Sequence, residues 1–125
     1  MAEIESLVKK LKSNIVSKQK KAALQLITIG EPAVSSIIEL LKDKKWYARK
    51  MAAFTLGEIK SKDAVSVLIS SLDDKHPDVR SQAANALVII GDKSVIQPLK
   101  DRLQKEKKKA VRKLIELSIK DLEKL

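Results

Sequence analysis

Few residues in this sequence have side chains suited to catalysis or metal binding. His76 is the only histidine and there is no cysteine, which excludes a thiolate nucleophile and a cysteine-based zinc site. A single histidine in a turn cannot form a metal site alone, and the nearby Asp73, Asp74 and Asp78 are explained by a turn and a helix start. No nucleophile–base pair and no glycine-rich phosphate loop is present. We therefore expect no enzymatic activity, no metal and no cofactor.

The elements that position these residues follow an internal repeat. Aligning Arg49 with Arg80, 31 positions further on, also aligns the alanine pairs at 52–53 and 83–84. Such small residues let another helix approach closely. Shifts of 30 and 32 positions extend the match to both ends. Four units therefore cover a single domain of 1–125, with approximate limits 1–30, 31–60, 61–91 and 92–125.

Each unit has the pattern of two short helices. In the third unit, apolar residues recur at helical spacing over 65–72, and a second helix starts at Pro77 and stops at Gly91. The same reasoning predicts second helices over about 17–29 and 46–59, and a longer one from about 106 to the C-terminus. Because neither helix of a unit can bury its apolar face alone, the units should stack into one continuous core as an α-solenoid.

The repeat resembles the short HEAT-like repeats of the phycobilisome-lyase type. The motif LxxxLxDxxxxVRxxAAxALxxIG is clearest over residues 68–91. The second unit has Lys60 in place of the glycine, the first has Gln19 in place of the arginine, and the last keeps Val111 and Arg112 but lacks the alanine pair. Degenerate first and last units are expected of end caps. The resemblance implies an all-α, right-handed α–α superhelix of about four two-helix HEAT-like repeats, but it says little about function.

The resemblance also implies roles for particular residues. In HEAT-like families the arginine usually bonds an aspartate in a turn between helices, in its own or an adjacent unit. We therefore expect a structural ladder formed by Asp43, Arg49, Asp74 and Arg80, because an arginine fork can bridge a carboxylate and backbone carbonyl groups together. HEAT-like deoxyhypusine hydroxylases carry His–Glu pairs for iron, and this chain has none, so we expect that activity to be excluded.

The charge of the chain could attract an anionic partner. Its 26 Lys and Arg and 16 Asp and Glu give a net charge of +10. By unit the net charge is +4, +2, −1 and +5 along the chain. The positive charge is therefore concentrated at the two ends, whereas a nucleic-acid track would need an unbroken stripe. An acidic protein fits this distribution at least as well as a nucleic acid, and a solvated lysine surface is the simplest alternative.

We expect a binding surface where units depart from the motif. If the second helices line the concave face of the solenoid, Lys20, Lys50 and Lys113 fall in one exposed column. The predicted partner-binding residues of this face and of the adjoining turn edge are Lys20, Lys44, Lys45, Trp46, Lys50, Met51, Phe54 and Lys113. Trp46 has an alternative role, packing on its neighbours. We interpret the chain as a non-enzymatic scaffold or adaptor for an acidic protein, with sequence-independent nucleic-acid binding and an accessory role related to bilin lyases as alternatives.

Apolar residues spread round more than one face of the last helix. Because an end cap should have a polar outer side, this pattern predicts either broader packing on the third unit or an apolar patch that binds a partner or, in a homodimer through this helix, a second copy. The first alternative predicts that the protein is a monomer. The chain has no apolar run long enough for a membrane span and no signal-peptide pattern, so we expect a cytoplasmic protein with no membrane contact.

Overall fold

The computed structural model describes residues 2–125, which form eight α-helices and no strand. The helices are α1 (Ala2–Leu11), α2 (Val16–Ile29), α3 (Val34–Leu40), α4 (Trp46–Ile59), α5 (Val65–Ser71), α6 (Pro77–Ile90), α7 (Ile96–Lys105) and α8 (Lys109–Glu123). One-turn 3₁₀ helices lead into α3, α5 and α7, over Glu31–Ala33, Lys62–Ala64 and Lys93–Val95.

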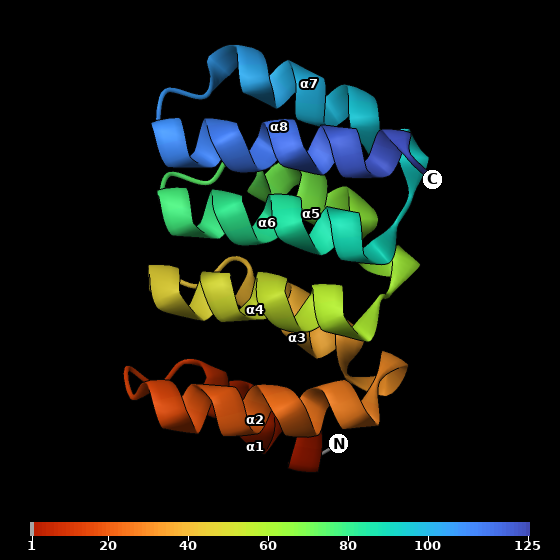
Figure 1. The fold of residues 1–125 in the computed structure, drawn as a ribbon. Coiled ribbons are helices and arrows are strands. Elements are labelled where there is room, and N and C mark those ends of the chain that lie inside the picture. The colour runs from red at the N-terminus through yellow and green to blue at the C-terminus, as the bar shows by residue number, and fades with distance from the viewer. Residues whose placement is uncertain (1) are drawn as a thin grey trace.

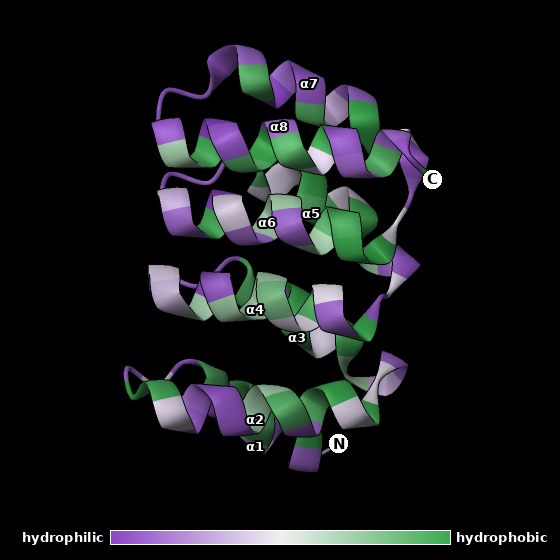
Figure 2. Ribbon diagram, in the orientation of Figure 1, coloured by the Kyte–Doolittle hydropathy of each residue, from purple (hydrophilic) through white to green (hydrophobic). Residues whose placement is uncertain are grey.

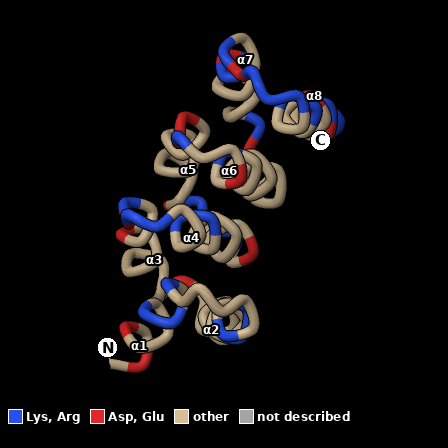
Figure 3. Tube along the Cα trace, turned by 90° about the vertical axis from the view of Figure 1, so that its left-hand side faces the viewer, with Lys and Arg blue, Asp and Glu red and all other residues tan. Residues whose placement is uncertain are grey.

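The helices lie in two layers (Figures 1 and 3). The odd-numbered helices form one layer and the even-numbered helices form the other, and successive pairs stack from the N-terminus to the C-terminus. Each pair packs internally, and the even-numbered helices pack on one another along the stack, most extensively α4 on α6. The predicted all-α superhelix of stacked helix pairs is therefore confirmed.

Helix ends follow local sequence signals. Pro77 is the first residue of α6, where a missing N–H costs no intrahelical bond, and Gly91 ends this helix at φ 76°. The predicted helix over 46–59 matches α4. The prediction for the last helix is wrong at its start, because α8 begins at Lys109 instead of about 106. Glu106 ends α7 in an extended conformation, and its carboxylate accepts from Arg80 of the preceding unit.

The core fills the space between the stacked pairs. Figure 2 shows that each helix alternates hydrophobic and hydrophilic segments, as expected of helices with one buried face. Ten leucine and isoleucine side chains are at most 2 % exposed: Leu11, Leu26, Ile37, Leu56, Leu68, Leu72, Leu87, Leu99, Ile115 and Leu122. They come from all four helix pairs, so the core is continuous along the stack.

α4 and α6 approach closely at Gly57, in the middle of the solenoid. A Cβ atom on Gly57 would lie 2.7 Å from both Cα and Cβ of Ala86. The close approach of helices was predicted from the alanines at 52–53 and 83–84, which are fully buried. Gly57 was not predicted, because its position is not specified in the repeat motif.

The last helix buries most of its apolar residues. Val111, Ile115 and Leu122 are at most 2 % exposed, so the wide apolar surface of α8 is used largely in packing on the third unit and on α7. Leu117 and Leu125 remain 45% and 64% exposed. Broader packing therefore accounts for most of the pattern, and the homodimer stays a prediction.

No single helix within residues 2–125 is long and apolar enough to cross a membrane. α2 and the segment Glu31–Leu40 meet the length and composition criterion only as a pair, with a bend of 120° between them. In the solenoid both segments contribute buried residues to the stacked core, among them Leu26 and Ile37.

Candidate functional site

A groove crosses the even-numbered layer between α2 and α4. Its volume is about 360 Å³. It is lined by Val16, Gln19, Lys20 and Leu24 of α2, by Lys50, Met51 and Phe54 of α4, and by Gln82 of α6. Large apolar side chains are open to solvent here, since Val16 is 59% exposed and Leu24 is 65% exposed. The groove therefore offers an apolar surface with an ammonium group on each wall.

The groove brings together four of the eight residues predicted to bind a partner. These are Lys20, Lys50, Met51 and Phe54. Met51 is only 8% exposed, so it contributes mainly packing. Lys113 lies on α8 and does not line this groove. The other four lining residues, Val16, Gln19, Leu24 and Gln82, were not among the predicted partner-binding residues, although Gln82 is the repeat equivalent of Met51.

Trp46 does not line the groove and packs on its neighbours instead. Its ring stacks on the His76 ring, with centroids 4.1 Å apart and planes 6° apart. Lys50 Nζ lies 5.9 Å from the centroid of the Trp46 ring, within range of a cation–π contact. Lys45 makes a similar contact with Tyr47, at 5.8 Å, whereas Lys44 is an exposed residue of the preceding turn. The predicted packing role of Trp46 is therefore what the structure shows, and it links the turn edge to the groove.

His76 has a structural role. Its Nδ1 accepts a hydrogen bond from the backbone N–H of Asp78 at 3.1 Å, which caps α6. Its own backbone N–H donates to Asp74 Oδ1. Residues 2–125 contain no cluster of three His, Cys, Asp or Glu side chains that could hold a metal ion. The described residues therefore offer no metal centre.

Buried arginine forks join successive repeats. Arg49 Nε and Nη2 donate to Asp74 Oδ2 and Oδ1 at 2.8 and 3.1 Å. Its Nη1 donates to the carbonyl groups of Asp43 and Lys44 in its own turn, at 2.8 and 3.1 Å. Of the two alternatives for the ladder, the carboxylate thus comes from the adjacent unit, and the unit of the arginine supplies backbone carbonyls.

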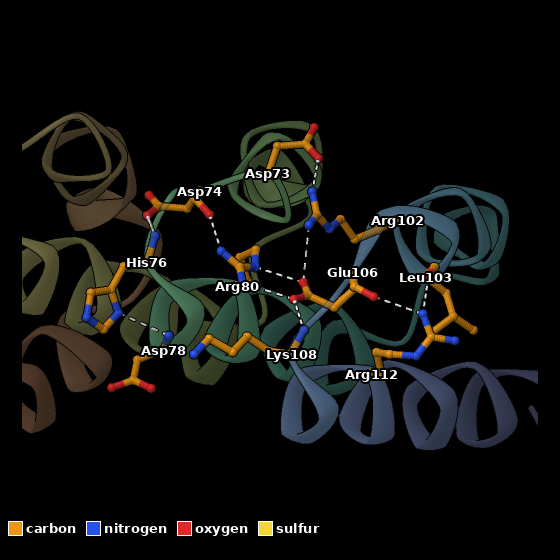
Figure 4. Close-up of polar contacts among 10 residues, drawn as sticks. All are labelled: Asp73, Asp74, His76, Asp78, Arg80, Arg102, Leu103, Glu106, Lys108 and Arg112. Carbon is orange, nitrogen blue, oxygen red and sulfur yellow. Dashed lines mark hydrogen bonds and ion pairs between the residues drawn. The ribbon is translucent and has the colours of Figure 1, made fainter.

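Arg80 repeats this geometry one unit further on (Figure 4). Its Nε and Nη2 donate to Glu106 Oε1 and Oε2 at 2.7 and 2.9 Å, and its Nη1 donates to the carbonyl group of Asp74 at 2.8 Å. Arg80 therefore contacts Asp74 only through its backbone carbonyl group, because the Asp74 carboxylate serves Arg49. Glu106 also pairs with Arg102 Nη2 at 3.3 Å. Glu106 was not predicted as a member of the ladder, since an aspartate was expected in the turn.

The turn between the two helices of each unit has one residue at an equivalent position. The side chains of these residues accept the backbone N–H two positions further on: Ser13 from Ile15, Asp43 from Lys45, Asp74 from His76 and Glu106 from Lys108, at 2.9 to 3.1 Å. The first rung of the ladder differs from the others. Gln19 donates to the carbonyl groups of Leu11 and Tyr47, while the Asp43 carboxylate pairs with Lys12 at 3.2 Å. The first arginine–carboxylate contact of the ladder therefore joins the second unit to the third.

Two turn carboxyls have lowered pKa values. Burial of Glu106 is the largest influence and raises its pKa, but the hydrogen bonds from Arg80 and Lys108 and the positive charges of Arg80 and Arg102 together lower the pKa below its ordinary value. Asp43 shows the same balance, in which burial is outweighed by the Lys45 N–H and by Lys12, and its pKa is also lowered. The ionised form is therefore favoured for the carboxyl groups of both Asp43 and Glu106.

The stacked helix pairs and their arginine ladder define an α-solenoid repeat protein. A family model described as HEAT repeats matches residues 4–70 and 34–120. The chain therefore belongs to the HEAT-repeat family, and the resemblance inferred from residues 68–91 is confirmed.

Several similar proteins are deoxyhypusine hydroxylases. The one from Arabidopsis thaliana is 35% identical over 114 residues, which is 89% of this chain and 36% of that protein. The one from Saccharomyces cerevisiae is 29% identical over an alignment of 126 residues that covers 90% of this chain and 39% of that protein. The solved structure of human deoxyhypusine hydroxylase in complex with glycerol is 26% identical, with a TM-score of 0.82, covering 99% of this chain and 44% of that chain. The chain thus spans roughly a quarter to two fifths of the curated relatives, 24% to 39%.

A second structure shares the fold. The complex of CpcE and CpcF of phycocyanin lyase from Nostoc matches with a TM-score of 0.72 and 22% identity, covering 94% of this chain and 98% of that chain. At this identity the likeness concerns the arrangement of helices alone. The accessory role related to bilin lyases is therefore the weaker interpretation of the two resemblances.

The hydroxylase relatives overturn the interpretation of the chain as a non-enzymatic scaffold. They are enzymes by name, and the plant and yeast proteins match about nine tenths of this chain, 89% and 90%. The expectation that hydroxylase activity is excluded rested on the missing His–Glu pairs alone. The absence of these pairs concerns metal ligands alone. The relationship to the enzymes lies in the repeats, so the missing pairs could not reveal it.

Proposed function

We propose that this chain forms part of an enzyme of the deoxyhypusine hydroxylase type, in which its groove binds the protein substrate. The observation that carries the proposal is the 35% identity to the plant hydroxylase over 89% of this chain. The structural likeness to the human enzyme over 99% of this chain supports it independently.

The described residues do not fit the iron that the hydroxylase relationship implies. His76 is the only histidine, its Nδ1 accepts the Asp78 N–H, and its ring is stacked against Trp46. No cluster of three candidate ligands exists within residues 2–125. We therefore assign no chemical step to the side chains of this chain, and place the metal ligands of the enzyme on another component.

The groove has the chemistry of a surface for a polypeptide. Lys20 and Lys50 stand on its two walls, and apolar side chains, including the half-buried Phe54, lie between them. An acidic segment with apolar side chains would pair its carboxylates with the lysines and bury its apolar groups on the floor. Because α2 and α4 are fixed by the core and by the ladder, the groove is preorganised, which lowers the entropy cost of binding.

Calorimetric titration of the full chain tests this role, with a deoxyhypusine-bearing protein as the probe. We expect binding that Lys50→Glu and Phe54→Ala each weaken by about tenfold or more. Lys42→Glu is the matched control, because Lys42 is an exposed lysine of the turn after α3 and lies outside the groove. Absence of binding by the folded chain would overturn the proposal.

Intact-mass analysis of the same mixture tests where the chemistry resides. With iron(II) and oxygen present, we expect no oxygen to be added to the substrate protein by this chain alone. Hydroxylation by the purified chain would show that the chain supplies the metal centre itself, contrary to the placement of the ligands on another component.

A further inference from the structure

The last rung of the arginine ladder is incomplete within residues 2–125. Arg112 occupies in α8 the position of Arg49 in α4 and Arg80 in α6. Its Nη1 donates to the carbonyl groups of Leu103 and Glu106, at 2.8 and 2.9 Å, as the other two arginines do with their own turns (Figure 4). The Nε and Nη2 of Arg49 and Arg80 hold the carboxylate of the next unit, whereas those of Arg112 have no acceptor in the described chain.

The open side of Arg112 is held ready for a carboxylate. The two carbonyl bonds fix the guanidinium in the orientation that it has in Arg49 and Arg80. A planar fork held in this way loses little side-chain freedom when it binds a second group. Bidentate, charge-assisted hydrogen bonds to a carboxylate are what the same fork makes in the two preceding units.

We propose that Arg112 receives the carboxylate of an inter-helix turn of a further HEAT unit, which docks on the α7–α8 end. The surface is the repeat equivalent of one that the chain already uses internally, where Arg80 of the third unit holds Glu106 of the fourth. The proposal goes beyond the groove and its substrate, and it does not depend on them.

The outer face of α8 further specifies this partner. Glu116 and Lys120 are exposed and stand where α6 has Ala84 and Val88. In α4 the equivalent of Lys120 is Gly57, which faces Ala86 of the next unit. A unit docked on α8 therefore meets charged side chains and must present polar residues, in contrast to the alanine-lined contact between α4 and α6.

A second copy of this chain lacks the turn carboxylate that Arg112 would bind. Its exposed first turn carries Ser13 at the place of Asp74 and Glu106, as the shared hydrogen bond to the backbone N–H two positions on shows. Head-to-tail stacking would otherwise be tolerated, since the equivalent of Ala86 in α2 is Gln25, a polar residue that would face Lys120. A carboxylate in place of Ser13 should therefore convert the chain into its own partner.

The experiment is sedimentation velocity over a concentration series, with Ser13→Asp and its neutral isostere Ser13→Asn as the matched pair. We expect Ser13→Asp to associate end to end and Ser13→Asn to sediment as the unaltered chain does. Adding Arg112→Ala to Ser13→Asp should weaken the association by about tenfold or more, and Arg112→Lys should weaken it too, because the charge is kept while the fork is lost.

Two results would overturn the proposal. One is equal sedimentation of the Ser13→Asp and Ser13→Asn chains at every concentration, and the other is association that persists unchanged after Arg112→Ala. Thermal melts of all four variants ensure that folded chains are compared. Neither result depends on substrate binding or hydroxylation, so the failure of this proposal and that of the proposed function are distinguishable.

Discussion

Arg80 and Glu106 form a two-bonded ion pair that ties the third repeat to the fourth, with Nε–Oε1 and Nη2–Oε2 distances of 2.7 and 2.9 Å. The side chain of Glu106 is 1% exposed and that of Arg80 is 11% exposed. Removal of one partner from such a pair leaves the other charge buried without compensation. The stability of the last helix pair should therefore depend strongly on this contact.

Arg80→Ala should lower the free energy of unfolding by about 3–5 kcal/mol, measured by thermal or urea unfolding. Lys42→Ala is the control, because the Lys42–Glu39 pair is 3.7 Å long with both side chains more than 70% exposed, at 77% and 72%. An exposed pair of this kind contributes about 0–1 kcal/mol. An unchanged melting temperature for Arg80→Ala would contradict the role of the ladder.

The stability of the chain should fall in acid through Glu106. Its pKa in the folded protein lies below the ordinary value of 4.5, although burial raises it, because the bonds to Arg80 and Lys108 and the charges of Arg80 and Arg102 outweigh the burial. A carboxyl with a depressed folded-state pKa stabilises the protein above its unfolded-state pKa, and this contribution is lost as the pH falls through the folded-state value. Stability due to this group should thus be fully present above about pH 4.5 and decline below it.

Urea unfolding of the unaltered chain and of Glu106→Gln at a series of pH values checks this dependence. Glu106→Gln should be the less stable protein at neutral pH. The difference in the free energy of unfolding between the two proteins should narrow as the pH falls below the ordinary pKa of glutamate. A difference that stays constant with pH would show that the ionised carboxylate contributes nothing.

Lys60→Gly should stabilise the chain. Lys60 ends α4 with φ 62° and is the only non-glycine residue with positive φ among residues 2–125. A side chain in this conformation costs roughly 1–2 kcal/mol, and the greater freedom of glycine in the unfolded chain offsets part of the gain. We expect a net increase of about 0.5–1 kcal/mol in the free energy of unfolding. A decrease would show that contacts of the Lys60 side chain outweigh its backbone strain.

Gly57→Ala should have the opposite effect, three residues earlier in the same helix. In an exposed helix interior this substitution would stabilise by about 1 kcal/mol. Here the new methyl group would lie 2.7 Å from Cα and Cβ of Ala86, so α4 and α6 must move apart, at a cost of about 1–3 kcal/mol. Chemical unfolding measures directly whether the substitution raises or lowers the free energy of unfolding. Glu58→Ala is the control, because Glu58 is the exposed next residue of the same helix. A stabilised Gly57→Ala would contradict the close approach.

Local signals in the sequence predicted the fold well, because Pro77, Gly91 and the repeated alanine pairs each act within one unit or between neighbouring units. The carboxylate partner of Arg80 could not be predicted in the same way. Asp74 fits the local spacing, but the bond is made to Glu106, 26 positions further along the chain. Which carboxylate meets which arginine depends on how one unit is placed on the next, and the motif does not contain that information.

The candidate site was predicted in part for a similar reason. Lys20, Lys50 and Phe54 meet because equivalent positions of α2 and α4 lie side by side. Lys113 occupies an equivalent position too, but the groove ends at Gln82 of α6. The relationship to hydroxylases could not be inferred from reactive residues, since the described chain lacks a metal centre and shares its repeats with the enzymes instead.

The forward reach of the arginines makes each repeat dependent on its successor, which sets rules for growth of the solenoid by duplication. A copy of residues 61–91 inserted after Gly91 would meet Arg80 with the duplicate of Asp74 and would offer its own arginine to Glu106. A copy of the first unit at the same point would offer a serine to Arg80 and a glutamine to Glu106. Lengthening within this lineage is therefore easiest with the units that carry both a turn carboxylate and a ladder arginine, and hardest with the first unit, which has neither.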